Sequence, residues 1–295
     1  MSDTLIFDRS FDDRYGEAVA LSPLVRRVIA HNPGPFTFNG TGTHIIGRGR
    51  VAILDPGPHD AAHVAALLAA VEGEHVDYIV VTHTHLDHIG ALPALALATG
   101  AQIVGAAPRP ADLAATPAEA VKYRPDRVMA QGEMIAGDGW SIEAIPTPGH
   151  TANHLAFGLT EEGSIFPGDH VMAWSTTVVL PPDGSMSDYT RSLKALLERD
   201  EDHYYPAHGP VLPGARNHVA GLLRHRERRE EYILDRVACG DRTIADIVVS
   251  LYPGLDPRLI GGARMSVFAH LRDLVARGMV RTDGDPELDG AYEMN

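Results

Sequence analysis

Cysteine is nearly absent from this chain of 295 residues, in which Cys239 is the only one. A single thiol cannot close a disulfide within the chain and cannot form a cysteine-based zinc knuckle. A metal site in this protein must therefore use histidine and carboxylate side chains. Both are abundant, because the sequence contains 16 His and 39 Asp and Glu residues.

Positive charge is also scarce. The 25 Lys and Arg residues are outnumbered by the acids, and the formal net charge is −14 at pH 7. A protein whose main task is to hold a nucleic-acid backbone needs clusters of Lys and Arg against the phosphates. The overall charge argues against that class of protein, although it does not exclude a local basic patch.

Long apolar runs are missing as well. The longest run without a charge, residues 91–108, is interrupted by Pro93, Gly100 and Gly105, and most of its apolar side chains are small. We therefore expect no membrane span. The N-terminus has acids where a signal peptide needs a basic stretch followed by an apolar one, so we expect a cytoplasmic protein.

The first half of the chain has the pattern of hairpins followed by a βαβ unit. Turn sequences such as Asn39-Gly40 interrupt the apolar stretches of residues 20–55, which is typical of hairpins. The pattern then predicts a strand over 51–54, a helix over 59–71 and a strand over 76–81. This last strand leads directly to His83.

Three more short strands end in the same way, with a histidine or an aspartate close behind. They are predicted over residues 142–145, 164–166 and 204–205, and they lead to His150, Asp169 and His208. Four strand ends that bring polar side chains to one rim are typical of sites in α/β folds.

After residue 213 the sequence becomes helical. We predict helices over 216–237, 244–251 and 265–277, followed by a turn at Thr282-Asp283-Gly284 that could tip a small hairpin. Three helices and a hairpin are the outline of a winged helix. The prediction is therefore two domains, a catalytic domain over 1–213 and a winged-helix-like domain over 214–295.

The segment after the second βαβ strand carries the strongest chemical signal. It places four metal-binding side chains within six positions: His83, His85, Asp87 and His88. Imidazole is the usual ligand of zinc, and carboxylate suits it as an oxygen donor. Surface loops seldom hold three histidines and an aspartate directly after a buried strand. His150, Asp169 and His208 each adjoin a glycine, where backbone can approach an ion closely, and they complete a predicted seven-ligand set.

Five motifs together resemble those of the metallo-β-lactamase superfamily: LDPG at 54–57, HTHLDH at 83–88, TPGHT at 147–151, PGD at 167–169 and PAHGP at 206–210. The resemblance covers roughly residues 30–212. It implies an αββα sandwich that binds two Zn²⁺ ions per chain, with other divalent metals possible. By this likeness His83, His85 and His150 bind the first ion, Asp87, His88 and His208 bind the second, Asp169 bridges them, and Asp55 orients a ligand imidazole.

The chemistry of the ligand set agrees with that resemblance. Two ions about 3.5–4 Å apart can share a hydroxide and hold it facing a polarised carbonyl or phosphoryl group. The carboxylate of Asp87 would aim this nucleophile, so Asp87 is the predicted catalytic residue. The mechanism needs no nucleophilic serine or cysteine.

Differences from other branches of the superfamily indicate which substrate and which metal to expect. True β-lactamases commonly have cysteine or a non-ligand where Asp169 stands, which disfavours a β-lactam substrate. The di-iron reductases of this fold have glutamate in place of His85, which favours zinc over iron. Only 39 positions separate Asp169 from His208, too few for the inserted domain of the large nucleases.

Within the superfamily the chain resembles the lactamase-β-like protein 2 group. The stretches that carry this likeness are NPGPFTFNGTGT at 32–43, STTVV at 175–179, SDYTRSLKALL at 187–197 and HLRDLVARGMV at 270–280. In that group the tail is a winged helix and the best-described members cut single-stranded RNA, whereas bacterial relatives are generally unassigned hydrolases. Similar cores also occur in thioesterases that act on acyl-carrier substrates.

We therefore expect a zinc-dependent hydrolase of an ester, thioester or related bond in a small or carrier-bound substrate. The alternative is a single-strand-specific endoribonuclease with the same metals. Two features argue against the endoribonuclease. The RNA-cutting members tend to have bulkier or basic residues where this chain has Thr84 and Leu86. The tail is also not basic, because residues 211–295 contain 12 Arg and no Lys against 13 acids. A third interpretation is a non-enzyme in which the winged tail binds DNA and the core only senses a ligand. The intact seven-ligand set argues against it, because a sensor has no need of an aligned hydroxide. A homodimer is possible.

Other residues near the motifs receive a role by position. We expect Trp174 and the loop over 175–187 to line the substrate site. His154 and His170, each close to a ligand in the sequence, are expected to hydrogen-bond to ligands. Four arginines alternate with glutamates along the predicted helix over 216–237, which indicates a solvated face with i,i+4 ion pairs rather than an RNA contact: Arg224, Arg226, Arg228 and Arg229.

Overall fold

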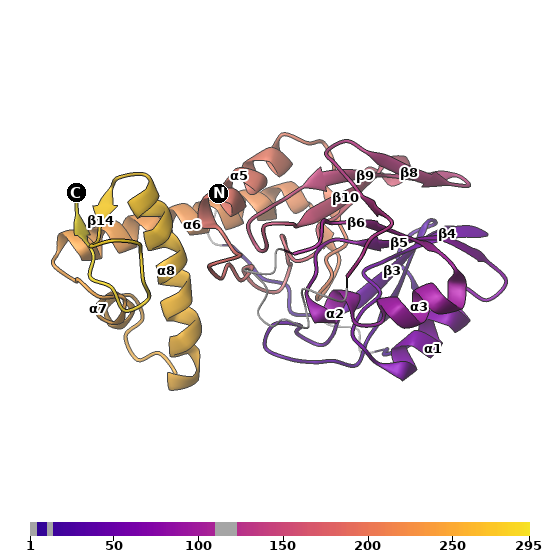
Figure 1. Cartoon of the computed structure of the whole chain (residues 1–295), viewed down its shortest axis with the longest axis horizontal. Coiled ribbons are helices and arrows are strands. Elements are labelled where there is room, and N and C mark those ends of the chain that lie inside the picture. Colours follow the sequence, from indigo (N-terminus) through magenta and orange to yellow (C-terminus); the bar gives the residue numbers. More distant parts are fainter. Residues whose placement is uncertain (1–4, 11–13, 110–122) are drawn as a thin grey trace.

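The structure, a computed structural model, describes residues 5–10, 14–109 and 123–295. It consists of a layered sandwich of two sheets and a smaller helical part formed by the end of the chain (Figure 1). Within the described ranges, no helix has both the length and the apolar character needed to cross a membrane.

The first sheet contains seven strands that lie in chain order: β1 (Val19–Ala20), β2 (Val25–Ile29), β3 (Gly42–Arg48), β4 (Arg50–Leu54), β5 (His75–Val81), β6 (Gln102–Gly105) and β7 (Arg127–Val128). Its first four strands are antiparallel, as predicted for residues 20–55, and β4 to β7 are parallel. Gly49, with φ 72°, turns the chain between β3 and β4. Helix α1 (Ala61–Ala70) connects β4 to β5, which confirms the βαβ unit.

The second sheet contains six strands in the order β13-β12-β11-β10-β9-β8. They are β8 (Met134–Gly137), β9 (Trp140–Pro146), β10 (Leu155–Leu159), β11 (Ser164–Phe166), β12 (His203–Tyr204) and β13 (Leu212–Pro213). Only β11 and β12 run parallel, because helix α5 (Met186–Leu197) crosses over between them.

Strand alternation separates the core into layers. Along β5, Val80 points into the core between the sheets, whereas Ile79 and Val81 point into the outer core. That outer core is covered by α1 and by α3 (Leu92–Thr99). The outer face of the second sheet packs against α5 and α6 (Ala215–Ala238). The result is the four-layered αββα sandwich that the motifs predicted.

The C-terminal part has its own core, formed by residues of α6, α7 (Ile244–Leu251), α8 (Ile260–Ala276) and strand β14 (Val280–Arg281), which pairs with β15 (Glu293–Met294). Helix α7 has the predicted bounds, and Thr243 and Asp246 cap its start reciprocally. Helix α8 begins five residues earlier than predicted, since Gly261 and Gly262 weaken the helical signal there.

The predicted tight hairpin turn at Thr282-Asp283-Gly284 is wrong, because these residues do not join the two strands directly. The partner of β14 is β15 at residues 293–294, so the turn opens a longer loop. Tyr292 explains the pairing, because its side chain is buried in the C-terminal core and its backbone N–H donates to Arg242 O at 2.8 Å.

Helix α6 belongs to both parts of the molecule. Val219 and Leu222 pack against the second sheet, whereas Ile233 and Val237 pack in the C-terminal core. The boundary predicted between residues 213 and 214 therefore falls at the start of a helix that the two cores share.

Candidate metal centre

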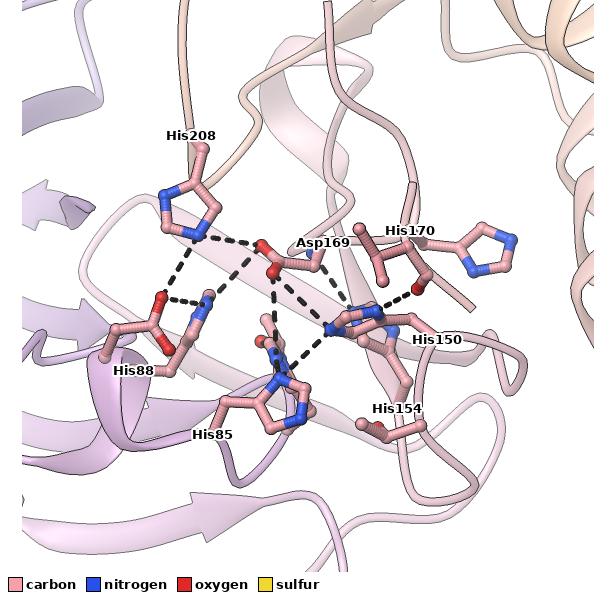
Figure 2. A network of polar contacts seen from close by, with 12 residues as sticks. His85, His88, His150, His154, Asp169, His170 and His208 are labelled. Atoms are coloured by element: carbon pink, nitrogen blue, oxygen red, sulfur yellow. Dashed lines mark hydrogen bonds and ion pairs between the residues drawn. The ribbon is translucent and has the colours of Figure 1, made fainter. Parts of the chain in front are cut away.

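The site is built where strands of both sheets end. Strand β5 leads into His83 and His85, and the short helix α2 (Leu86–Ile89) carries Asp87 and His88. The second sheet supplies the other three side chains, which follow β9, β11 and β12: His150, Asp169 and His208. Figure 2 shows the side chains of His85, His88, His150, Asp169 and His208 pointing toward one another.

The seven side chains form two groups. One group is His83, His85, His150 and Asp169, the other is Asp87, His88 and His208, and within each group the possible ligand atoms lie within 4.8 Å of one another. This is the division that the resemblance implied.

Asp169 faces both groups. Its Oδ2 is 3.5 Å from His150 Nε2 and 3.9 Å from His83 Nε2. Its Oδ1 is 3.4 Å from His88 Nε2 and 3.3 Å from His208 Nε2. Each carboxylate oxygen is thus directed at a different group, which is the arrangement a bridging ligand requires.

The first group converges on a space that fits a metal ion. His85 Nδ1 lies 3.0 Å from His83 Nε2 and 3.1 Å from His150 Nε2. Four-coordinate zinc with bonds of about 2.0–2.1 Å separates its nitrogen ligands by roughly 3.3 Å, close to this spacing. The donor set and its spacing therefore fit zinc.

Within the part of the chain that the structure describes, two nitrogen atoms of the second group and the Asp169 oxygen that faces them lack a hydrogen-bond partner. His88 Nε2, His208 Nε2 and Asp169 Oδ1 are all buried without a hydrogen bond of good geometry among the described residues. Unsatisfied buried polar atoms are costly, so they call for an explanation. A divalent cation between them would satisfy all three, and imidazole and carboxylate are suitable ligands for it.

Asp55 orients His88. Its Oδ2 accepts hydrogen bonds from His88 Nδ1 at 2.9 Å and from Thr82 Oγ1 at 2.8 Å, and its Oδ1 accepts one from Thr82 N at 2.8 Å. Because His88 donates from Nδ1, its Nε2 lone pair is free to face the second group. Asp55 is fully buried with φ 50°, a left-handed conformation that aspartate tolerates better than most residues.

Backbone carbonyls orient two other imidazoles. His208 Nδ1 donates to Gly40 O at 3.2 Å, and His150 Nδ1 donates to Val178 O at 2.6 Å. In both rings Nε2 is left to face the cluster. His83 uses a side chain instead, since its Nδ1 lies 3.0 Å from Thr82 Oγ1, which itself donates to Asp55.

The two groups differ in protonation. Burial, reinforced by the neighbouring imidazoles, lowers the pKa of His83 well below its usual value, and burial lowers that of His85 to about 3. Burial also lowers the pKa of His208, but Asp169 and Asp87 outweigh it and raise the value to about 10. His83 and His85 are thus neutral imidazoles, whereas His208 holds a proton that a cation would replace.

His154 supports Asp169 through the backbone. Its Nε2 accepts a hydrogen bond from Asp169 N at 3.2 Å, and its Nδ1 donates to Thr147 Oγ1 at 2.8 Å. Burial lowers the pKa of His154 well below its usual value, which keeps the Nε2 acceptor available. His154 therefore holds the main chain of a ligand in place.

The structure does not support the expected role of His170. Its ring points away from the cluster in Figure 2 and packs against Tyr189, with the ring centroids 4.6 Å apart. Neither ring nitrogen has a hydrogen-bond partner among the described residues. Asp169 turns toward the site, so the next side chain in the sequence turns toward α5.

Trp174 also lies differently from the expectation. A cavity of about 320 Å³ opens over the site, and the loop after Trp174 contributes Val178 and Leu180 to its lining. Trp174 itself is not part of that lining. Its ring stacks on Phe38 with centroids 4.8 Å apart and lies against Gly209, next to His208.

Three residues outside the five metal-site motifs hold the candidate ligands in place, directly or through one another. Thr177 Oγ1 donates to Asp169 O and to His170 O, both at 2.9 Å, and Val178 O receives the His150 hydrogen bond. Arg226 of α6 donates to Thr177 O and is only 5% exposed. The solvated face predicted for the arginines of this helix is therefore wrong at Arg226, because the C-terminal part covers it.

An Asp55→Asn variant is expected to bind the second metal ion about 10- to 100-fold more weakly. The amide cannot accept hydrogen bonds from both Thr82 and His88 on two oxygens, although asparagine tolerates the positive φ. Competition with a chelator measures the affinity. Asp60→Asn, at the half-buried N-cap of α1, is the matched control. Equal affinities in both variants would remove Asp55 from the centre.

Comparisons with known sequences identify both parts of the chain. A family model described as the metallo-beta-lactamase superfamily matches residues 38–208, and one described as a beta-lactamase associated winged helix domain matches residues 243–290. A beta-lactamase-like protein 2 homolog of Caenorhabditis elegans is 34% identical over 224 residues, 72% of this chain and 71% of that protein. An atrochrysone carboxyl ACP thioesterase of Aspergillus fumigatus is 31% identical over 240 residues, which cover 78% of this chain and 71% of the thioesterase.

Solved structures agree on the fold. A beta-lactamase domain protein from Burkholderia ambifaria has a TM-score of 0.78 at 21% identity, covering 96% of this chain and 94% of its own. A metallo-beta-lactamase family protein from Thermus thermophilus has a TM-score of 0.74 at 22% identity, covering 94% of this chain and all of its own. The sandwich, the His and Asp cluster and the match over residues 38–208 lead to one conclusion: the chain belongs to the metallo-β-lactamase superfamily, generally hydrolases, and carries the associated winged helix domain.

Proposed function

We propose that this protein is a zinc-dependent hydrolase that binds two ions per chain and cleaves an ester, thioester or related bond of a small or acyl-carrier-bound substrate. The observation that carries the proposal is the position of Asp169, whose two oxygens face separate groups of ligand atoms beneath an open cavity. Two divalent ions, when bound, lower the pKa of water and polarise a carbonyl oxygen.

Asp87 is the proposed catalytic residue. Its Oδ2 lies 3.3 Å from His208 Nε2 and 3.5 Å from His88 Nε2, which ties the carboxylate to the second group. The side chain is 27% exposed and lines the cavity, so it also reaches the substrate side. From there the carboxylate accepts a hydrogen bond from the attacking water and orients it toward the scissile carbonyl.

The cavity lining favours a carbonyl substrate over a phosphodiester. The residues around the ligands are apolar: Phe36, Leu86, Met172, Val178 and Leu180. Neither Lys nor Arg contributes to the described lining, although phosphodiester recognition draws on such cations. The similarity to an atrochrysone carboxyl ACP thioesterase supports a thioester in particular.

A hydrolysis screen of the zinc-loaded protein tests the proposal. The panel contains acyl thioesters, esters, lactones, β-lactams and single-stranded RNA. We expect thioester hydrolysis that stops when a chelator removes the metal and returns when zinc is restored. Activity that persists after chelation would refute the metal-dependent mechanism. Cleavage of RNA alone would establish the endoribonuclease alternative instead.

Three companion predictions come from the sequence alone: zinc as the native metal, a cytoplasmic location and a possible homodimer. Elemental analysis of protein purified without added metal tests the first. Fractionation of the source cells tests the second, and light scattering tests the third.

A further inference from the structure

A second cavity adjoins the one over the metal centre. Its volume is about 490 Å³, and it lies between the loop over residues 175–180 and the C-terminal domain, which contributes Tyr252, Leu255 and Met265. Phe36, Val178 and Leu180 line both cavities, so the two cavities adjoin each other. We call this second cavity the distal groove. Figure 1 shows α8, whose first half lines this groove, on the side of the C-terminal part that faces the sandwich.

The distal groove is mostly apolar. Phe36 is 66% exposed, Leu180 41% and Leu259 59%, so large apolar side chains are left in contact with water along its walls. Contiguous exposed apolar surface of this kind typically marks a binding site. Its volume also falls in the range of about 300–1,000 Å³ that is usual for small-molecule sites.

The charge of the distal groove excludes a polyanionic occupant. Arg226 is the only charged residue in the described lining. Its side chain is 5% exposed and donates to Thr177 O, so the guanidinium is engaged by the protein. A nucleic-acid strand would need several exposed cations along its path.

The start of α8 leaves room in the distal groove. Gly261, Gly262 and Ala263 form part of the lining. A Cβ atom built at Gly261 or Gly262 meets no other atom within 4 Å, so there is open space next to both glycines. A larger side chain at either position has space to project into the groove, and it would also raise the helix propensity of α8.

We infer that the distal groove binds the apolar acyl chain of the substrate, so that the scissile carbonyl lies at the metal centre and the chain extends toward the C-terminal domain. The inference deepens the proposed hydrolase function and rests on it. The substrate class is therefore a thioester of a medium or long apolar acyl group. The winged helix domain forms one wall of the substrate site.

The first test is a chain-length series of N-acetylcysteamine thioesters from acetyl to dodecanoyl. We expect kcat/KM to rise by about fourfold per buried methylene until the groove is filled. Gly262→Leu should lower kcat/KM for the long chains at least tenfold, with the acetyl rate within twofold of the wild type. Ala245→Leu, at an exposed position of α7 that is not part of the lining of the distal groove, is the matched control and should change neither.

A polar substitution gives an independent test of the same wall. Leu259→Ser should weaken the preference for long chains, whereas Val249→Ser should leave it intact. Val249 is the appropriate control because it is 72% exposed in the same domain but lies outside the distal groove. Equal effects of the two serine variants would overturn the inference.

Binding to metal-free protein separates the groove from catalysis. Calorimetry with non-hydrolysable alkyl thioethers should show affinity that increases with chain length and is lost in Gly262→Leu. If no thioester is hydrolysed but this dependence remains, the proposed reaction is wrong and the acyl-chain site stands. If acetyl and dodecanoyl thioesters react equally well, the proposed reaction stands and the acyl-chain site is wrong. RNA cleavage that responds to Gly262→Leu would assign the groove to nucleotides and refute the inference.

Discussion

Replacing Asp169 with alanine is expected to lower kcat by about 1,000-fold or more and to reduce the zinc content below two ions per chain. The reason is geometric. Asp169 is the one member of the cluster whose oxygens face both groups of ligand atoms, Oδ2 toward His150 and Oδ1 toward His208. Losing it removes a ligand from each ion at once, so occupancy and turnover fall together.

Elemental analysis and a thioester assay on the same preparation measure this outcome. Asp138→Asn, in the exposed turn between β8 and β9, removes a carboxylate from the surface and should leave both quantities unchanged. Circular dichroism of both variants without metal checks that the sandwich is folded. Full activity in Asp169→Ala, or an unchanged stoichiometry of two ions, would contradict the proposed centre.

An Asp87→Asn variant should separate rate from binding. The amide fills the same space beside His208 but lacks the negative charge that orients a water molecule. At saturating zinc we expect kcat to fall about 100-fold, the size typical of removing one general base, while KM stays within threefold. The melting temperature of the zinc form should change little, because the side chain is 27% exposed.

Rescue distinguishes a catalytic role from a purely metal-binding one. If Asp87 acts on the attacking water, raising the zinc concentration restores occupancy in Asp87→Asn without restoring kcat. A variant that regains the wild-type rate once zinc is saturating would show that Asp87 is only a ligand.

The layers of the fold could be predicted because they depend on local periodicity. Ile79, Val80 and Val81 alternate between two cores, and the strand they form ends where the ligand run begins. The candidate ligands were identifiable for a related reason, since each lies within a few residues of the end of a strand. Parallel strands bring such positions to a common edge, whatever the intervening loops do.

Side-chain direction beyond the strand ends was not predictable. Asp169 and His170 are adjacent in the sequence, yet one enters the site and the other packs on Tyr189. Trp174 precedes a loop that lines the cavity, but its ring packs on Phe38. These directions depend on contacts between distant segments, which neither spacing nor composition encodes.

The burial of the Arg226 guanidinium could not be predicted from the sequence either. Arg226 lies in a stripe of arginines and glutamates that is the same whether the helix faces water or another domain. Only the packing of α8 and of the loop over residues 175–180 shows that this guanidinium is covered and that it braces Thr177.

Helix α6 also determines how freely the winged helix domain can move. Its 24 residues pass from one core to the other without interruption. Sharp kinks in helices arise at proline, at glycine or serine pairs or at π-bulges, and α6 contains no proline and a single glycine, Gly221, packed against Leu5. The helix therefore connects the two cores rigidly and contains no site at which the domains could hinge. A rigid connection of this kind preorganises the wall of the distal groove that the C-terminal domain contributes, so an acyl chain that enters would lose its own conformational entropy without having to immobilise a mobile domain.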